Sequence, residues 1–155
     1  MKQEWVGLEE LMTNLNIEIA KIKDKTMKGY IEVAILLRRS SELDTPTVPV
    51  DWGNLHNSFF TTTGKAEGSG TFEGPKAGEI SSQHSSVKAK YKAEAKESAE
   101  PLMILGFSAN YATFVHENKE AKFKRPGSGA GFLRTSIDEN KQKILSLIRE
   151  NAKIR

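Results

Sequence analysis

The chain has 155 residues, of which 37% are hydrophobic and 28% are charged, and its formal net charge is +3. This length is typical of one domain with a single core, and the composition is that of a soluble protein with a large solvated surface. The absence of cysteine excludes disulfides, iron–sulfur clusters and thiol catalysis, and three widely spaced histidines (His56, His84 and His116) do not predict a zinc site. The sequence has neither a run of about 18 apolar residues nor a secretory signal, so we expect the protein in the cytoplasm.

Residues 8–44 predict one long amphipathic helix. The apolar residues that recur at helical spacing are Leu8, Leu11, Met12, Leu15, Ile19, Ile22, Met27, Tyr30, Ile31, Ala34 and Leu37. Gly29 interrupts this pattern at a cost of about 1 kcal/mol relative to alanine, which is consistent with a kink near residues 24–28. The helix must end before Pro46, because proline disfavours helical backbone in the residue before it.

The stretch "TPTVPVDWGNLHNSFF", residues 45–60, predicts a rigid corner between this helix and a sheet. We expect Asp51 to accept a hydrogen bond from the backbone N–H of Gly53 or Asn54, as an Asx turn or a short helical cap. Gly53 allows a tight turn, and the aromatic and β-branched residues of 55–63 predict a strand. The candidate residues of this structural corner are Pro49, Asp51, Gly53, Leu55 and Ser58.

The middle of the chain, residues 64–100, predicts a long polar hairpin that forms a mobile arm. Residues 64–86 contain few large apolar side chains, which indicates a mobile tip or a partly disordered loop. In residues 86–96 small or apolar side chains alternate with charged ones, which favours a strand with one basic face, although the Ala, Lys and Glu content also suits a helix. The short apolar run "LMILGF", residues 102–107, predicts a buried central strand.

The last third of the chain completes the expected fold. Residues 109–117 predict a helical turn that covers the sheet, a basic, glycine-rich loop follows at 122–131, and residues 132–154 predict a second long amphipathic helix. The order of elements predicts a single α+β domain over residues 1–155. We expect an antiparallel sheet of about four strands within residues 55–108, with both long helices packed on the same face.

No arrangement of residues in the sequence predicts catalysis or a cofactor. Asp51, His56 and Ser58 are the residue types of a hydrolytic triad, but no Gly-x-Ser-x-Gly turn frames the serine. His116 beside Glu117 suggests a general base only when considered alone, because acid–base pairs also need a cleft and perturbed neighbours. We therefore predict that the protein is not an enzyme and binds no metal or cofactor.

Basic side chains are unevenly distributed. Residues 1–44 carry seven Lys or Arg against eight Asp or Glu, whereas residues 118–155 carry ten against four. Such an excess is typical of a surface that binds the backbone of a nucleic acid or an acidic protein surface. It is equally typical of an ordinary solvated helix face. The candidate residues that would face DNA or a partner are Lys88, Lys90, Lys92, Lys141, Lys143, Arg149 and Lys153.

Three blocks of the sequence, taken in order, carry a family resemblance. The first block, with Trp52 where a threonine is usual and an extra turn at Thr45-Pro46, consists of Pro49, Val50, Asp51, Gly53, Leu55 and Ser58. The second block consists of Tyr111, Ala112, Val115 and Glu117, and the third of Phe132 and Leu133, with Ala130-Gly131 where a proline is frequent. As a set, and over most of the chain except residues 64–100, these blocks resemble the tail-completion or neck proteins of long-tailed bacteriophages.

The resemblance implies a virion structural protein without catalysis, which forms a ring of identical chains, expected to be a hexamer, where the tail tube meets the head. Its expected neighbours are head-closure, tail-terminator or tail-tube proteins, and residues 64–100 would be the contact arm. The protein would lie at the head–tail interface of the virion, and in the host cytoplasm during assembly. Two alternatives remain open: a tail terminator, and a non-specific nucleic-acid-binding protein that uses the basic C-terminal region.

Overall fold

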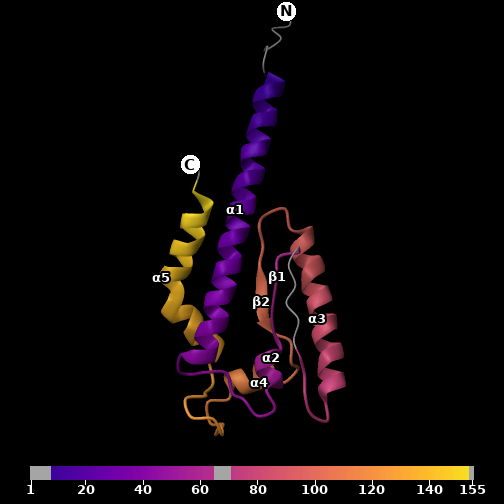
Figure 1. Ribbon diagram of the computed structural model, residues 1–155, viewed down its shortest axis with the longest axis vertical. Coiled ribbons are helices and arrows are strands. Elements are labelled where there is room, and N and C mark those ends of the chain that lie inside the picture. The colour runs from indigo at the N-terminus through magenta and orange to yellow at the C-terminus, as the bar shows by residue number, and fades with distance from the viewer. Residues whose placement is uncertain (1–7, 65–70, 154–155) are drawn as a thin grey trace, which may run out of the picture.

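The computed structural model describes residues 8–64 and 71–153 of the chain. Its helices and strands are α1 (Leu8–Leu43), α2 (Asn54–Asn57), β1 (Phe59–Thr62), α3 (Ala77–Glu97), β2 (Ile104–Phe107), α4 (Ala112–Glu117) and α5 (Phe132–Ala152). The fold is α+β, and the long N-terminal and C-terminal helices predicted from the apolar periodicity are confirmed. Figure 1 shows that the first turns of α1 extend well beyond the other elements.

Helices α1 and α5 lie side by side along the second half of α1 (Figure 1). Helix α1 continues without a break through Gly29, where the sequence was consistent with a kink. Gly29 is buried, and a Cβ at this position would lie 3.1 Å from the Cα of Ile148 and 3.2 Å from the Cβ of Asn151. The glycine therefore allows the two helix backbones to approach closely, which explains a residue of low helix propensity in a helix interior.

The sheet of the described residues has two antiparallel strands, so the prediction of about four strands is wrong. Phe59 pairs with Phe107 and Thr62 pairs with Ile104. The apolar run 102–107 supplies β2, but its residues are only partly buried and the strand is not central. Because two strands rarely form a stable sheet by themselves, this ribbon depends on the helices that cover it.

Residues 77–97 form helix α3, so the strand predicted for residues 86–96 and the hairpin predicted around it are wrong. Alternating alanines are too small to give a strand an apolar face, whereas Ala, Lys and Glu all favour a helix. Helix α3 packs against β1, where the ring of Tyr91 stacks on Phe60 with centroids 5.7 Å apart. Residues 65–70 of the predicted mobile tip lie outside the described residues.

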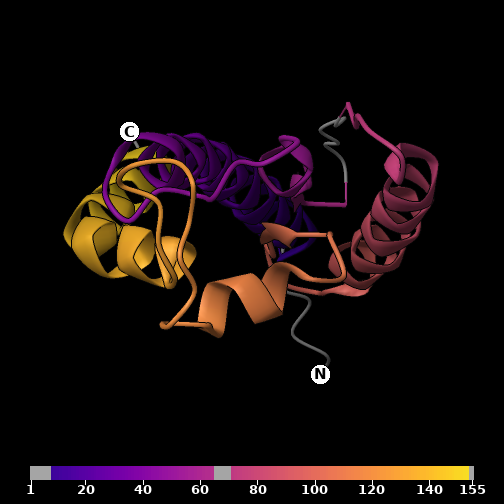
Figure 2. The same cartoon turned by 90° about the horizontal axis from the view of Figure 1, so that it is seen from below.

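The helices and strands follow one another across the molecule in the order α5, α1, the two strands and α3 (Figure 2). Helix α5 packs on α1, so the two long helices do not share one face of the sheet as expected. The short helices α2 and α4 lie at the end of the molecule opposite to the projecting turns of α1 (Figure 1). This end carries the main buried cluster and the groove described below.

Candidate functional site

The three sequence blocks that carry the family resemblance meet at one place in the structure. One buried cluster draws on all three: Val48, Leu55, Ala109, Ala112 and Phe132, with Phe107, Val115 and Leu133 packed against it. The ring of Phe132, only 1% exposed, meets the rings of Phe107 and His116 edge to face at centroid distances of 5.2 and 4.9 Å. These contacts hold the corner, α4 and the start of α5 together.

The corner before α2 differs from expectation in one detail. Gly53 precedes α2 with φ of 79°, in the left-handed region that glycine tolerates best. The carboxylate of Asp51, which we expected to cap this turn, instead accepts a hydrogen bond from Lys124 Nζ at 2.7 Å. Both side chains are well exposed, so this ion pair contributes little to stability.

Asp51, His56 and Ser58, the residue types of a hydrolytic triad, do not form the hydrogen-bonded chain of a catalytic triad. Ser58 is fully buried, and its hydroxyl donates to the carbonyl oxygen of Leu55 at 2.7 Å. His56 Nε2 lies 3.0 Å from a carboxylate oxygen of Glu42 in α1. Since Asp51 pairs with a lysine, each of the three has a different partner, and the serine is held by its own turn.

Glu117 links α4 to the first turn of α5. One of its carboxylate oxygens lies 2.8 Å from His116 Nδ1 and accepts a hydrogen bond from Arg134 Nη2 at 2.9 Å. The hydrogen bond with His116, and then the positive charge of Arg134, lower the pKa of the Glu117 carboxyl. Glu117 is therefore ionised over the whole neutral range and acts as a structural anion.

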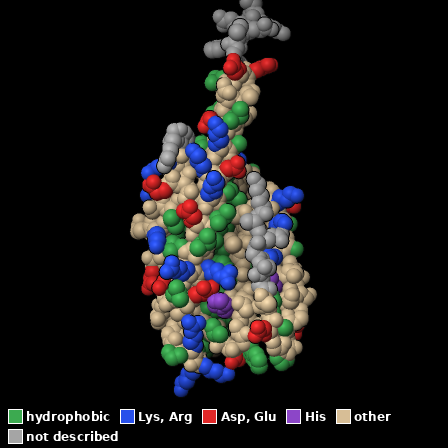
Figure 3. All heavy atoms as spheres, viewed as in Figure 1, with side chains coloured by type: hydrophobic (Ala, Val, Ile, Leu, Met, Phe, Trp, Pro, Cys, Tyr) green, Lys and Arg blue, Asp and Glu red, His purple; other side chains and the backbone are tan. Residues whose placement is uncertain are grey.

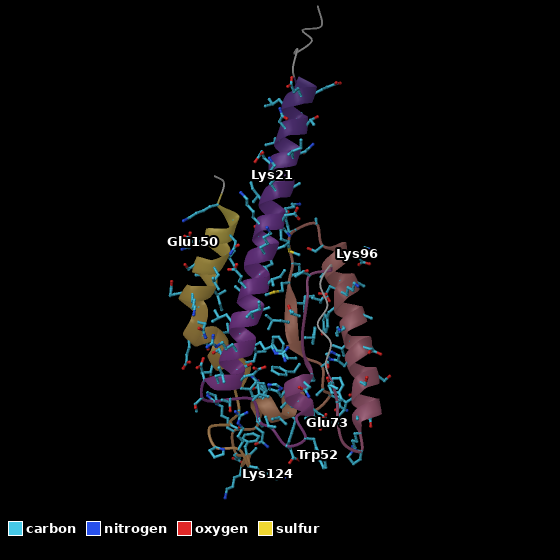
Figure 4. The ribbon with its side chains drawn as sticks, in the orientation of Figure 1. Lys21, Trp52, Glu73, Lys96, Lys124 and Glu150 are labelled. Carbon is cyan, nitrogen blue, oxygen red and sulfur yellow. The ribbon has the colours of Figure 1, made fainter. Side chains whose placement is uncertain are left out.

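A groove of about 590 Å³ opens beside the corner, and we call it the corner groove. Its largely apolar lining comes from four segments of the chain, residues 49–55, 73–80, 111–115 and 122–124. Figure 4 shows Trp52, Glu73 and Lys124 at this end of the molecule, opposite to the projecting turns of α1.

Several side chains shape the walls of the corner groove. Trp52 is 62% exposed and lies over Gly74, where a Cβ would be 3.2 Å from its ring. The side-chain amide of Asn54 donates to the Glu73 carbonyl at 2.8 Å and accepts from the Glu73 N–H at 2.9 Å, so it ties this segment to α2. Burial, and then the negative charge of Asp51, raise the pKa of Tyr111, which keeps its hydroxyl protonated. Sequence reasoning missed this groove, although Trp52, which departs from the family pattern, was a signal for it.

The start of α1, residues 8–22, is a second apolar surface, and we call it the α1 extension. At its base, Ile19 and Ile22 line a hollow together with Glu100 and Pro101. The α1 extension carries exposed apolar side chains at helical spacing, namely Leu11, Met12, Leu15 and Ile19, which are 64, 50, 51 and 42% exposed. Figure 3 shows hydrophobic side chains among the charged ones on this projecting helix. The same face of α1 is buried further along, where Val33 and Leu37 are 4% and 3% exposed.

The predicted basic residues fall on two separate helices. Lys88, Lys90 and Lys92 lie on α3, and Lys141, Lys143 and Arg149 lie on α5. Lys153, which follows α5, pairs with Glu150 at 2.6 Å. Helices α3 and α5 are at opposite sides of the molecule, so these residues do not form one patch (Figure 2).

Comparisons with known proteins add no relative. A scan against protein-family models and searches of curated proteins and of solved structures find no match for this chain. Within residues 8–64 and 71–153, no helix combines the length and apolar character that a membrane span requires. The same residues contain no group of three or more His, Asp and Glu side chains placed to hold a metal ion.

Proposed function

We propose that this chain is a structural protein of the head–tail junction of a long-tailed bacteriophage, where copies of it assemble into a ring as a tail-completion or neck protein. The observation that carries the proposal is the α1 extension. Contiguous apolar side chains on a projecting helix expose a surface that monomeric proteins usually bury, and such surfaces mark interaction sites. The meeting of the three family blocks in one cluster supports the same proposal.

A rigid corner suits a ring subunit, because each interface must repeat the same geometry. Thr47 donates its N–H to the Gly127 carbonyl at 2.8 Å and accepts from the Gly129 N–H at 3.2 Å, which ties the glycine-rich loop to the corner. A Cβ at Gly129 would lie 2.9 Å from the Cβ of Pro46, so glycine permits this close packing. The loop therefore belongs to the corner and braces it.

Mass measurement of the purified protein over a range of concentrations, combined with electron microscopy, tests the proposal. We expect closed rings of identical chains in solution, and density for this chain at the neck of assembled particles. The neighbours seen in the particles distinguish a tail-completion protein from a tail terminator. A protein that stays monomeric at every concentration and never enters particles contradicts the proposal.

A second candidate function is non-specific binding of nucleic acid. One observation favours it: Lys88, Lys92 and Lys96 line a hollow on α3 together with Ser85. Contacts of lysines with phosphates release counterions, so DNA retention should weaken steeply as salt rises. Two variants test this candidate: one replaces Lys88, Lys92 and Lys96 of α3 by glutamine, and the other replaces Lys141, Lys143, Arg149 and Lys153 at α5. If a variant retains DNA as well as the parent chain does, the helix that it alters is excluded as a DNA-binding surface.

A further inference from the structure

We propose that the α1 extension of one chain docks in the corner groove of a neighbouring copy. This inference rests on the proposed self-assembly and assigns the two surfaces that meet in it. Both surfaces are largely apolar, and within residues 8–64 and 71–153 they leave large apolar side chains exposed, including Leu11, Leu15 and Trp52. The two surfaces lie at opposite ends of the molecule (Figure 1 and Figure 4). Helix α1 has 36 residues and is therefore about 54 Å long, so the extension cannot reach the groove of its own chain.

The α1 extension presents the pattern of a helix that binds in a groove. With about 3.6 residues per turn, Leu11, Leu15 and Ile19 share one face, whereas Ile17 lies on the opposite face. Apolar anchors spaced three or four residues apart are the usual signature of helix-in-groove recognition. Because the stripe continues onto the face of α1 that packs on α5, docking would extend the buried surface of α1 along its length.

The corner groove is of a size and character that suits such anchors. Its volume of about 590 Å³ is within the usual range for binding pockets, about 300–1,000 Å³. Leu55 and Ile80, each 5% exposed, are among its lining residues, and Trp52 and Tyr111 supply aromatic walls that remain exposed. Exposed aromatic side chains of this kind are frequent anchors of interfaces.

Charge complementarity selects the second copy as the occupant. The α1 extension carries three carboxylates, Glu9, Glu10 and Glu18, against one lysine, Lys21. The lining of the corner groove includes three lysines, Lys76, Lys122 and Lys124, and two carboxylates, Asp51 and Glu73, of which Asp51 pairs with Lys124. The loop at residues 118–125, which borders the groove, carries four Lys or Arg against one Glu. A net acidic helix with an apolar stripe would therefore meet an apolar groove beside a net basic loop.

The proposed contact is heterologous, because one surface of each chain binds a different surface of the next. Such an interface leaves one free surface at each end of a chain of subunits until the ring closes. The extension of the last copy then occupies the groove of the first. This arrangement assigns the head-to-tail order of subunits in the proposed ring.

Matched substitutions on the two faces of the α1 extension provide the first test. Leu15→Asp should weaken self-association at least about tenfold, as expected for an interface anchor. Ile17→Asp, at a side chain of similar exposure on the opposite face, should leave self-association unchanged. Both side chains project from the body, so the far-UV spectrum and unfolding midpoint of each variant should match those of the parent. Equal effects of the two substitutions on association overturn the proposal.

Engineered disulfides provide the second test, which identifies the partner surface. The chain has no cysteine, so single cysteines at Asn16 and at Lys76 can be placed on separate chains and mixed under mild oxidation. We expect an intermolecular disulfide between Asn16→Cys and Lys76→Cys, because these bonds form only when Cα atoms come within about 7 Å. The matched control is Arg39→Cys, on α1 outside the extension, which should link to Lys76→Cys far more slowly.

The outcomes of the second test separate the two proposals. Preferential linkage of Asn16→Cys to itself shows that extensions pair with each other, which overturns the docking in the groove. Rings that form without any linkage above the control also overturn it and leave the ring assembly standing. A protein that is monomeric at all concentrations overturns both.

Discussion

Replacement of Gly29 by alanine tests the close approach of α1 and α5. In an isolated helix this change stabilises by about 1 kcal/mol, because alanine has the higher propensity. Here the new Cβ would lie 3.1 to 3.3 Å from the Cα of Ile148, the Cβ of Asn151 and the carbonyl oxygen of Leu147. The helices must separate by several tenths of an ångström, and such overpacking costs about 1–3 kcal/mol. We therefore expect a net destabilisation of about 0–2 kcal/mol.

Gly78 in α3 is the matched control, since a Cβ there meets no atom of the described residues within 4 Å. Gly78→Ala should increase the free energy of unfolding by about 0.5–1 kcal/mol. Urea unfolding followed by circular dichroism measures both variants against the parent chain, with the slope on denaturant checked for a change in mechanism. If Gly29→Ala stabilises the protein as much as Gly78→Ala does, the packing of α5 on α1 described above is incorrect.

Three further predictions concern the core and its polar contacts. Phe132→Ala should reduce the free energy of unfolding by about 3–5 kcal/mol. The control is Phe114→Ala, at an exposed side chain, which should reduce it by no more than about 0.5 kcal/mol. Equal losses in the two variants would contradict the assigned core. Burial, and then a neighbouring lysine charge, lower the pKa of His84 from 6.5, so the unfolded chain binds the proton first and stability should fall as the pH drops below 6.5. Unfolding midpoints measured across this pH range should show that fall in the parent chain and a smaller one in His84→Asn. Asn54→Ala leaves the backbone groups of Glu73 without their partner and should cost about 1–3 kcal/mol, with faster amide exchange at Glu73 as the local readout.

The two long helices could be predicted from the sequence because their signal is local and repeated. Apolar residues recur at helical spacing over many turns of α1 and α5, and Pro46 limits the first of these helices. The turn at Gly53 follows from chemistry within a few residues in the same way. The three sequence blocks that carry the family resemblance also contain residues that share one buried cluster in the structure, such as Leu55, Ala112 and Phe132.

The number of strands and the nature of α3 could not be predicted, because they depend on pairing between distant segments. The alternation in residues 86–96 fits a strand, whereas their composition fits a helix. The contact that holds this segment in place is the stacking of Tyr91 on Phe60, and Phe60 lies in a distant part of the sequence. The lining of the corner groove likewise comes from four separated segments, so no single stretch of the sequence predicts the groove. The same holds for Gly29, whose role depends on where α5 lies.

The amino-acid sequence alone determined that the residues of α1 are helical with one apolar face, since helical periodicity is a property of neighbouring residues. Only the tertiary structure decided which part of that face is covered. Helix α5 has 21 residues against 36 in α1, and it packs along the second half of α1. The first turns of α1, with Leu11, Met12 and Leu15, therefore keep their apolar side chains in solvent, because no element in the described part of the same chain extends far enough to cover them.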